Sequence, residues 1–162
     1  MKAVVLIGHG GVPTDFPPER VGRLRSLEAA RQRAGGPLSQ EEEQLDHEIR
    51  NWPRTPATEP FFYGLQAIAD GVRKNIGDTK LEVAFNEFCG PSIEEACARL
   101  IKEGFDEIVL LSTMVTRGGI HSEFEIPEII EKLQVQYPSV HFNYRWPYNL
   151  DEVGAFFAAQ LS

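Results

Sequence analysis

The pattern of apolar and polar positions predicts four β-strands separated by helices. Residues 3–7 and 107–111 are apolar on both faces, which is typical of central strands in a parallel sheet. Residues 81–85 predict a third strand, and the alternating segment 140–146 predicts an edge strand. Strands joined by helix-sized connections favour right-handed crossovers, so we expect an α/β fold with helices on both faces of the sheet.

Four segments between and after these strands have the apolar spacing of helices. The first begins with Thr58 as its N-cap and extends to Val72. The second opens at Ser92, and its inward face is formed by Ile93, Ala96, Cys97 and Leu100. Helices are also expected over about 125–137 and 150–161.

The long segment at about 15–57 does not fit this alternation. Residues 17–34 predict a basic helix, and Ser39 with Glu42 forms a capping box for an acidic helix that follows. Opposite charges on successive helices favour an antiparallel hairpin. We therefore expect one domain comprising all 162 residues, with an inserted helical arm at about 15–57.

The net charge, the cysteine spacing and the length of the first apolar run limit which partners and cellular locations are expected. The formal net charge of −8 argues against a nucleic-acid partner, since phosphate binding needs a basic face, but it does not repel a metal cation. Cys89 and Cys97 lie eight positions apart, which is neither a CxxC metal pair nor a disulfide framework, so buried thiols are expected. The first apolar run is too short for a signal peptide or a membrane span. A cytoplasmic protein that has no membrane association is the expectation.

Residues that bind metals follow three of the predicted strands. His9 follows the first, Glu87 the second, and His121 lies in a long glycine-bearing segment after the third. The carboxyl ends of parallel strands meet at one edge of a sheet, where ligands bind. Imidazole and carboxylate suit Fe²⁺, Co²⁺, Ni²⁺ or Zn²⁺, and three ligands leave coordination positions open. We expect His9 and His121 to bind a metal that is handed on or acts chemically, with Glu87 beside them.

Structural roles are the alternative for several of these polar residues. Glu87 could cap a neighbouring helix, and Glu123 and Glu125 could favour a helix N-terminus. His47 belongs to the acidic helix and is expected to be solvated. His141 lies on the predicted edge strand and is expected to be structural.

Three sequence blocks resemble the sirohydrochlorin cobaltochelatase and ferrochelatase family, the small class II chelatases. They are Gly8-His9-Gly10, AFNEFCGPSIEEA at 84–96 and GGIHSEFEIPEII at 118–130. The third block is the most specific, because it carries the pattern GG-x-H-x-x-x-[DE]-I-P. The resemblance covers residues 2–11 and 60–161.

The resemblance implies a flavodoxin-like chelatase module that inserts Co²⁺, Fe²⁺ or Ni²⁺ into a sirohydrochlorin-type tetrapyrrole without ATP or another cofactor. It implies that His9 and His121 bind the metal and accept pyrrole protons, and that Glu87 is an acidic helper. With one GHG and one GGxH block, the chain resembles the short members, which pair as homodimers. A second copy and a tetrapyrrole are therefore the expected partners.

The chain departs from the family pattern at three places. Gly11-Val12 follows GHG where relatives usually have Ser-Arg, Glu125 stands where aspartate is frequent, and the arm at about 15–57 is absent from the minimal module. These departures leave the identity of the tetrapyrrole open.

Two other functions remain alternatives. A metal or tetrapyrrole carrier on the same fold would use the same histidines without catalysing insertion. A histidine phosphatase also has a histidine after its first strand, but in an Arg-His-Gly motif, and here Gly8 replaces the arginine.

Overall fold

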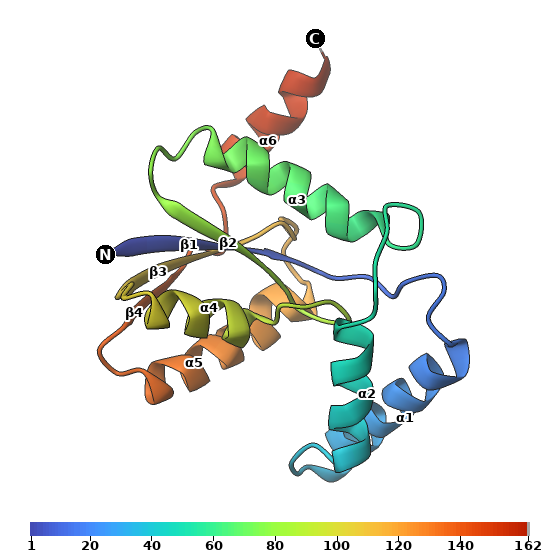
Figure 1. Cartoon of the computed structure of the whole chain (residues 1–162). Helices are drawn as coiled ribbons and strands as arrows, with labels where there is room; N and C mark the ends of the chain where they lie inside the picture. The colour runs from blue at the N-terminus through green and yellow to red at the C-terminus, as the bar shows by residue number, and fades with distance from the viewer. Residues whose placement is uncertain (162) are drawn as a thin grey trace.

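A four-stranded parallel sheet forms the centre of the protein. The computed structural model describes residues 1–161, and its strands lie in the order β2-β1-β3-β4 (Figure 1). The strands are β1 (Lys2–Gly8), β2 (Lys80–Phe85), β3 (Glu107–Ser112) and β4 (His141–Tyr144). Every pairing is parallel, which confirms the predicted α/β class. β1 and β3 are central and β4 is an edge strand, as expected.

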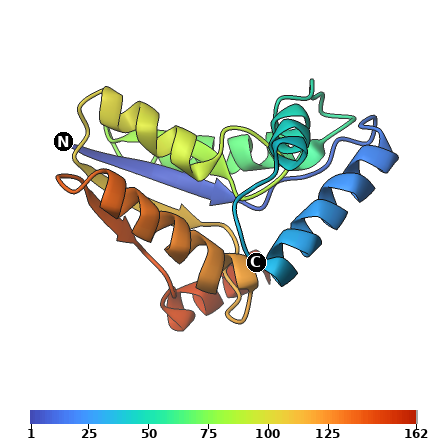
Figure 2. The same ribbon diagram turned by 90° about the horizontal axis from the view of Figure 1, so that it is seen from below.

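Helices cover both faces of this sheet (Figures 1 and 2). α3 (Pro60–Arg73) packs on one face through a cluster that includes Leu6, Leu65 and Ala69. α4 (Ile93–Lys102) and α5 (Ile126–Gln136) pack on the other face. The residues predicted for the inner face of α4 are all buried, and its capping box of Ser92 and Glu95 is complete. α6 (Leu150–Ala158) and the short turn η2 (Ala159–Leu161) follow β4.

Some element boundaries differ from the sequence prediction. The N-cap of α3 is Glu59, whose carboxylate accepts a hydrogen bond from the Phe62 N–H, whereas Thr58 bonds locally with Thr55. β4 is shorter than predicted, beginning at His141 and ending at Tyr144. The fifth helix begins one residue after Glu125, directly behind a π-helical turn, η1 (His121–Glu125).

The inserted segment forms two packed helices, α1 (Pro18–Ala34) and α2 (Gln40–Arg50). They are joined by ion pairs between Arg20 and Glu48, Arg23 and Glu41, and Arg31 and Glu42. The predicted capping box is only half formed. The Ser39 hydroxyl accepts the Glu42 N–H, but the Glu42 side chain pairs with Arg31 in the hairpin instead of returning to Ser39.

The hairpin lies at the carboxyl end of the sheet (Figure 2). A small apolar cluster joins it to the rest of the fold and contains Phe16, Leu24, Ile49 and Phe88. We call residues 15–57, which include α1 and α2, the arm. Among residues 1–161, no helix is long and apolar enough to cross a membrane.

Replacing Leu100 with alanine is expected to lower the free energy of unfolding by about 3 kcal/mol. Its side chain is completely buried between α4 and the sheet, so truncation leaves a cavity. Chemical denaturation checks the value. Val135→Ala is the matched control, because Val135 is 84% exposed and should change stability by less than about 0.5 kcal/mol. Equal losses for both variants would contradict this description of the core.

Candidate metal centre

The structure brings His9, Glu87 and His121 together at the carboxyl edge of the sheet. His9 directly follows β1, Glu87 lies two residues after β2, and His121 is the first residue of η1 after β3. One ligand atom from each residue lies within 4.8 Å of the others. Because β1 lies between β2 and β3, the three chain segments meet beside its end.

The spacing of these atoms fits a single metal ion. The Glu87 Oε1 atom lies 3.0 Å from His9 Nε2 and 3.7 Å from His121 Nε2. Ligands about 2.1 Å from a tetrahedral ion are about 3.4 Å apart, so small side-chain adjustments bring both pairs to that value. The imidazole rings lie edge to face with centroids 4.7 Å apart. All three side chains are partly exposed, which leaves room for an entering ligand.

The backbone orients the His9 ring. Its Nδ1 lies 2.8 Å from the Gly10 carbonyl oxygen, which can only accept, so Nδ1 carries the proton and Nε2 is free toward Glu87. Gly10 has a positive φ of 99°, and a Cβ there would lie 1.8 Å from the Glu87 carbonyl oxygen. Only glycine allows the two loops to approach this closely.

His121 is oriented by two residues that the sequence analysis did not assign to the site. Its Nδ1 lies 2.6 Å from Glu125 Oε2, and the Asn86 amide nitrogen donates to the same oxygen at 2.8 Å. Burial raises the pKa of the Glu125 carboxyl, but hydrogen bonds from His121 and Asn86 outweigh it, so the pKa lies below its usual value. The ionised carboxylate accepts the Nδ1 proton and leaves Nε2 free. A carboxylate behind a metal-binding histidine raises its basicity and fixes its orientation.

The carboxylate of Glu59 fills the space beside Gly11 in the loop after His9. The Glu59 side chain is 2% exposed and lies against Gly11, where an added Cβ would be 2.6 Å from Oε1. The serine that relatives have at this position would compete with the Glu59 carboxylate for the same space.

Two acidic residues near the centre have different surroundings. Glu28 of α1 is half-buried, and its pKa is raised first by burial and then by repulsion from Glu87. Glu123 instead pairs with Arg117 and the Gly118 N–H, away from the histidines.

The remaining histidines and both thiols lie outside the site. His47 and His141 are exposed, on α2 and at the start of β4, as expected. Cys89 and Cys97 are buried, which confirms that prediction. Burial raises the pKa of Cys89 to about 11 and that of Cys97 to about 12, so neither supplies a thiolate near neutral pH.

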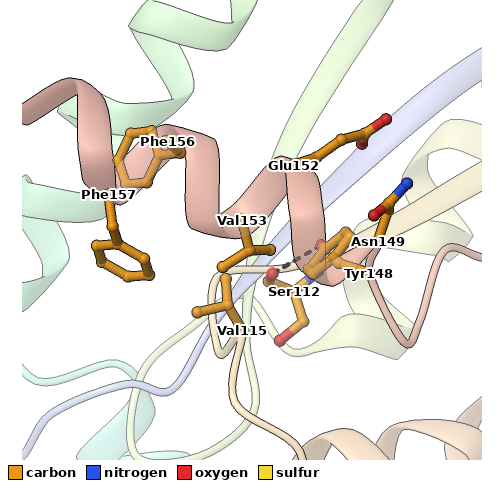
Figure 3. Close-up of a pocket in the computed structure, with 8 residues that line it drawn as sticks. All are labelled: Ser112, Val115, Tyr148, Asn149, Glu152, Val153, Phe156 and Phe157. Atoms are coloured by element: carbon orange, nitrogen blue, oxygen red, sulfur yellow. Dashed lines mark hydrogen bonds between the residues drawn. The ribbon is translucent and has the colours of Figure 1, made fainter.

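A pocket of about 290 Å³ lies elsewhere on the carboxyl edge, between the end of β3 and α6 (Figure 3). The Tyr148 hydroxyl bonds to the backbone of Ser112 and closes one side of it. Phe156 and Phe157 of α6 line the other side and are 63% and 55% exposed. The pocket therefore joins a largely apolar surface on α6.

Comparison with known proteins establishes the family. The CbiX family model matches residues 63–153, more than half of the 162-residue chain. The chain belongs to the CbiX family. This confirms the resemblance to the sirohydrochlorin chelatases. Glu87 and His121 lie within the matched residues, whereas His9 and the arm lie outside them.

Curated relatives of this CbiX-family chain are named sirohydrochlorin ferrochelatase. One from Priestia megaterium is 32% identical over 89 residues, which are 54% of this chain and 33% of that protein. One from Bacillus subtilis (strain 168) is 29% identical over 86 residues, again 33% of that protein. The chain thus matches about a third of the length of these relatives.

Solved structures show the same fold at low sequence identity. The cobalt complex of the sirohydrochlorin chelatase SirB from Bacillus subtilis subspecies spizizenii has a TM-score of 0.51 and 19% identity, covering 88% of this chain and 42% of that chain. A Marinobacter aquaeolei protein described as a cobalamin (vitamin B12) biosynthesis CbiX protein has a TM-score of 0.54 and 14% identity. That match covers 98% of this chain and 91% of the Marinobacter chain.

Glu125→Gln is expected to weaken Co²⁺ binding about tenfold to a hundredfold. The amide cannot hold the His121 Nδ1 proton as an ionised carboxylate does, so Nε2 becomes a poorer ligand. Titration calorimetry with Co²⁺ measures the change. Glu123→Gln is the matched control in the same turn and should leave the affinity within about threefold, since Glu123 faces Arg117. Similar losses in both variants would contradict the assigned role of Glu125.

Proposed function

We propose that this CbiX-family chain inserts Co²⁺ or Fe²⁺ into a sirohydrochlorin-type tetrapyrrole. The convergence of one ligand atom each from His9, Glu87 and His121 within 4.8 Å supports this proposal most strongly. Nitrogen and carboxylate ligands suit these ions, and an incomplete ligand set allows release. Curated relatives are named sirohydrochlorin ferrochelatase, and SirB structures contain cobalt or Fe³⁺. Ni²⁺ suits the same ligands and is included in the proposal.

In the proposed mechanism, His9 and His121 exchange the metal for protons. Two pyrrole N–H protons must leave the macrocycle as the divalent ion enters it. As the macrocycle nitrogens replace the imidazoles on the metal, each freed Nε2 lone pair can accept one proton. Glu87 Oε1 lies beside both nitrogens and stabilises the resulting imidazolium ions. The exchange needs no ATP, and the sequence contains no Walker-type phosphate loop.

The neighbours of His9 disfavour the phosphatase alternative. Phosphate transfer needs cationic groups around the phosphoryl oxygens. Here the histidine faces the carboxylate of Glu87, and the carboxylate of Glu125 lies behind His121. This negative charge attracts a metal cation and repels a phosphate.

An insertion assay with sirohydrochlorin and Co²⁺ tests the proposal. We expect metallation, followed by absorbance, to exceed the protein-free rate. His9→Ala and His121→Ala should each reduce it about a hundredfold or more, because each removes a metal ligand and a proton acceptor. His47→Ala is the control, since His47 is an exposed histidine on α2.

Each contrary result has a distinct meaning. A wild-type protein that binds Co²⁺ but metallates no faster than buffer would support the carrier alternative. Activity retained in both His9→Ala and His121→Ala would show that the site is wrongly assigned.

We also propose that two copies of the chain pair through α6. The helix has no buried residue, and its exposed apolar side chains include Leu150, Phe156 and Phe157. Apolar side chains gathered on a surface mark an interaction site. A second copy is the proposed occupant because each chain has one set of site residues, as in the short family members that pair.

Phe156→Ser combined with Phe157→Ser is expected to convert the dimer to a monomer. Light scattering after size-exclusion chromatography measures the mass, which for one chain is 18.2 kDa. Val135→Ser on α5 is the control, because it removes an even more exposed apolar side chain elsewhere. A monomeric wild-type protein, or a dimer unaffected by the double substitution, would contradict the pairing.

A further inference from the structure

The short connection between β2 and α4 determines where the Glu87 carboxylate lies. We call residues 86–90 the Glu87 loop. Within it, Phe88 has a positive φ of 58°, which is uncommon for a residue with a bulky side chain. Such a conformation persists only where the surroundings hold it in place. The contacts of the Glu87 loop therefore bear directly on the metal centre.

Two arginines of the inserted segment donate to carbonyl groups of the Glu87 loop. Arg50, the last residue of α2, donates to Asn86 O at 3.2 Å and to Cys89 O at 2.9 Å, and its own carbonyl accepts the Gly90 N–H. Arg54 donates to Phe88 O at 2.5 Å. Figure 1 shows the end of α2 where it meets this connection.

Both arginines are held in place by further contacts. The Arg54 side chain is 6% exposed and donates to the carbonyl groups of Ile49, Arg50 and Trp52. The Arg50 Nε donates to Asp46 Oδ2 at 2.7 Å, and its side chain is 17% exposed. Each guanidinium thus bridges the arm and the Glu87 loop in a fixed orientation.

The arm also holds the side chain of Phe88. Its ring is 7% exposed and packs with Phe16, Leu24 and Ile49, and the Arg25 guanidinium lies 5.7 Å from the ring centroid. The neighbouring residue Glu87 instead directs its carboxylate to the histidines. The buried ring and the bound carbonyls together fix the backbone from which Glu87 extends.

We propose that the arm positions Glu87 in the metal centre, with Arg50 and Arg54 as positioning residues. The inference rests on the proposed metal-binding role of His9, Glu87 and His121. The arginines fix the backbone of the Glu87 loop. The position of this backbone determines where the Glu87 carboxylate lies. Without the arm, Asn86, Phe88 and Cys89 lose the donors to their carbonyl groups, and Phe88 loses its apolar surroundings.

Arg50→Gln tests this role in the full-length protein. We expect Co²⁺ affinity, measured by calorimetry, to fall at least tenfold while thermal unfolding stays cooperative. The visible spectrum of bound Co²⁺ should resemble that of Glu87→Gln, because both lose the carboxylate ligand. Arg23→Gln is the matched control: Arg23 belongs to the same hairpin and pairs with Glu41 without contacting the Glu87 loop. It should leave the affinity within threefold.

A double-mutant comparison separates positioning from general stabilisation. In the Glu87→Gln background, Arg50→Gln should weaken Co²⁺ binding by less than threefold, since the carboxylate that it positions is already absent. An equal loss in both backgrounds would overturn the proposal. If Arg50→Gln does not fold, Asp46→Asn serves instead, because it keeps Arg50 but removes the carboxylate that orients it. At least a threefold loss is expected, and unchanged affinity would overturn the proposal.

The wild-type measurement distinguishes this inference from the proposed function. Wild-type protein that binds no Co²⁺, or binds it equally well in His9→Ala, refutes the metal centre and the positioning role together. Wild-type protein whose binding depends on His9 but not on Arg50 refutes the positioning role alone.

Discussion

The candidate metal centre depends on the parallel pairing of β1 with β2, which continues past the last strand residues. The N–H groups of Asn86 and Glu87 donate to the carbonyl oxygens of Gly8 and His9, each at 2.9 Å. A shift of register by one residue would turn Glu87 to the opposite face and separate it from His9. His121 can join them because β3 pairs with the other side of β1.

The positions of the candidate metal ligands could largely be predicted from the sequence, because a few neighbouring residues show where each strand ends. The apolar runs that became β1 and β3 are hydrophobic on both faces, and the polar residues after them can then lie only at the carboxyl edge of the sheet. The hairpin was likewise predictable from the opposite charges of α1 and α2, which the ion pairs between them confirm.

Other parts depend on contacts between distant residues. Glu125 lies four residues after His121, a spacing that puts two side chains on one face of a helical turn. The sequence did not show that His121 itself begins such a turn. Asn86 precedes Glu87 in the sequence and was overlooked because its partners lie 35 and 39 positions away. Arg50 and Arg54 lie in the inserted segment, and no motif pairs them with residues 86–90. The carbonyl groups that they bind become neighbours only when the arm folds against the Glu87 loop.

The contact between Gly11 and Glu59 links two parts of the molecule that a sequence comparison treats separately. Glu59 begins α3 by accepting the Phe62 N–H, and its carboxylate fills the space beside Gly11. A serine at position 11 would therefore displace the Glu59 carboxylate, so the start of α3 would have to adjust to it. The same carboxylate lies 3.7 Å from Nε of the buried Arg54 side chain, so its displacement would also disturb that ion pair. The residue at position 11 and the N-cap of α3 therefore have to change together.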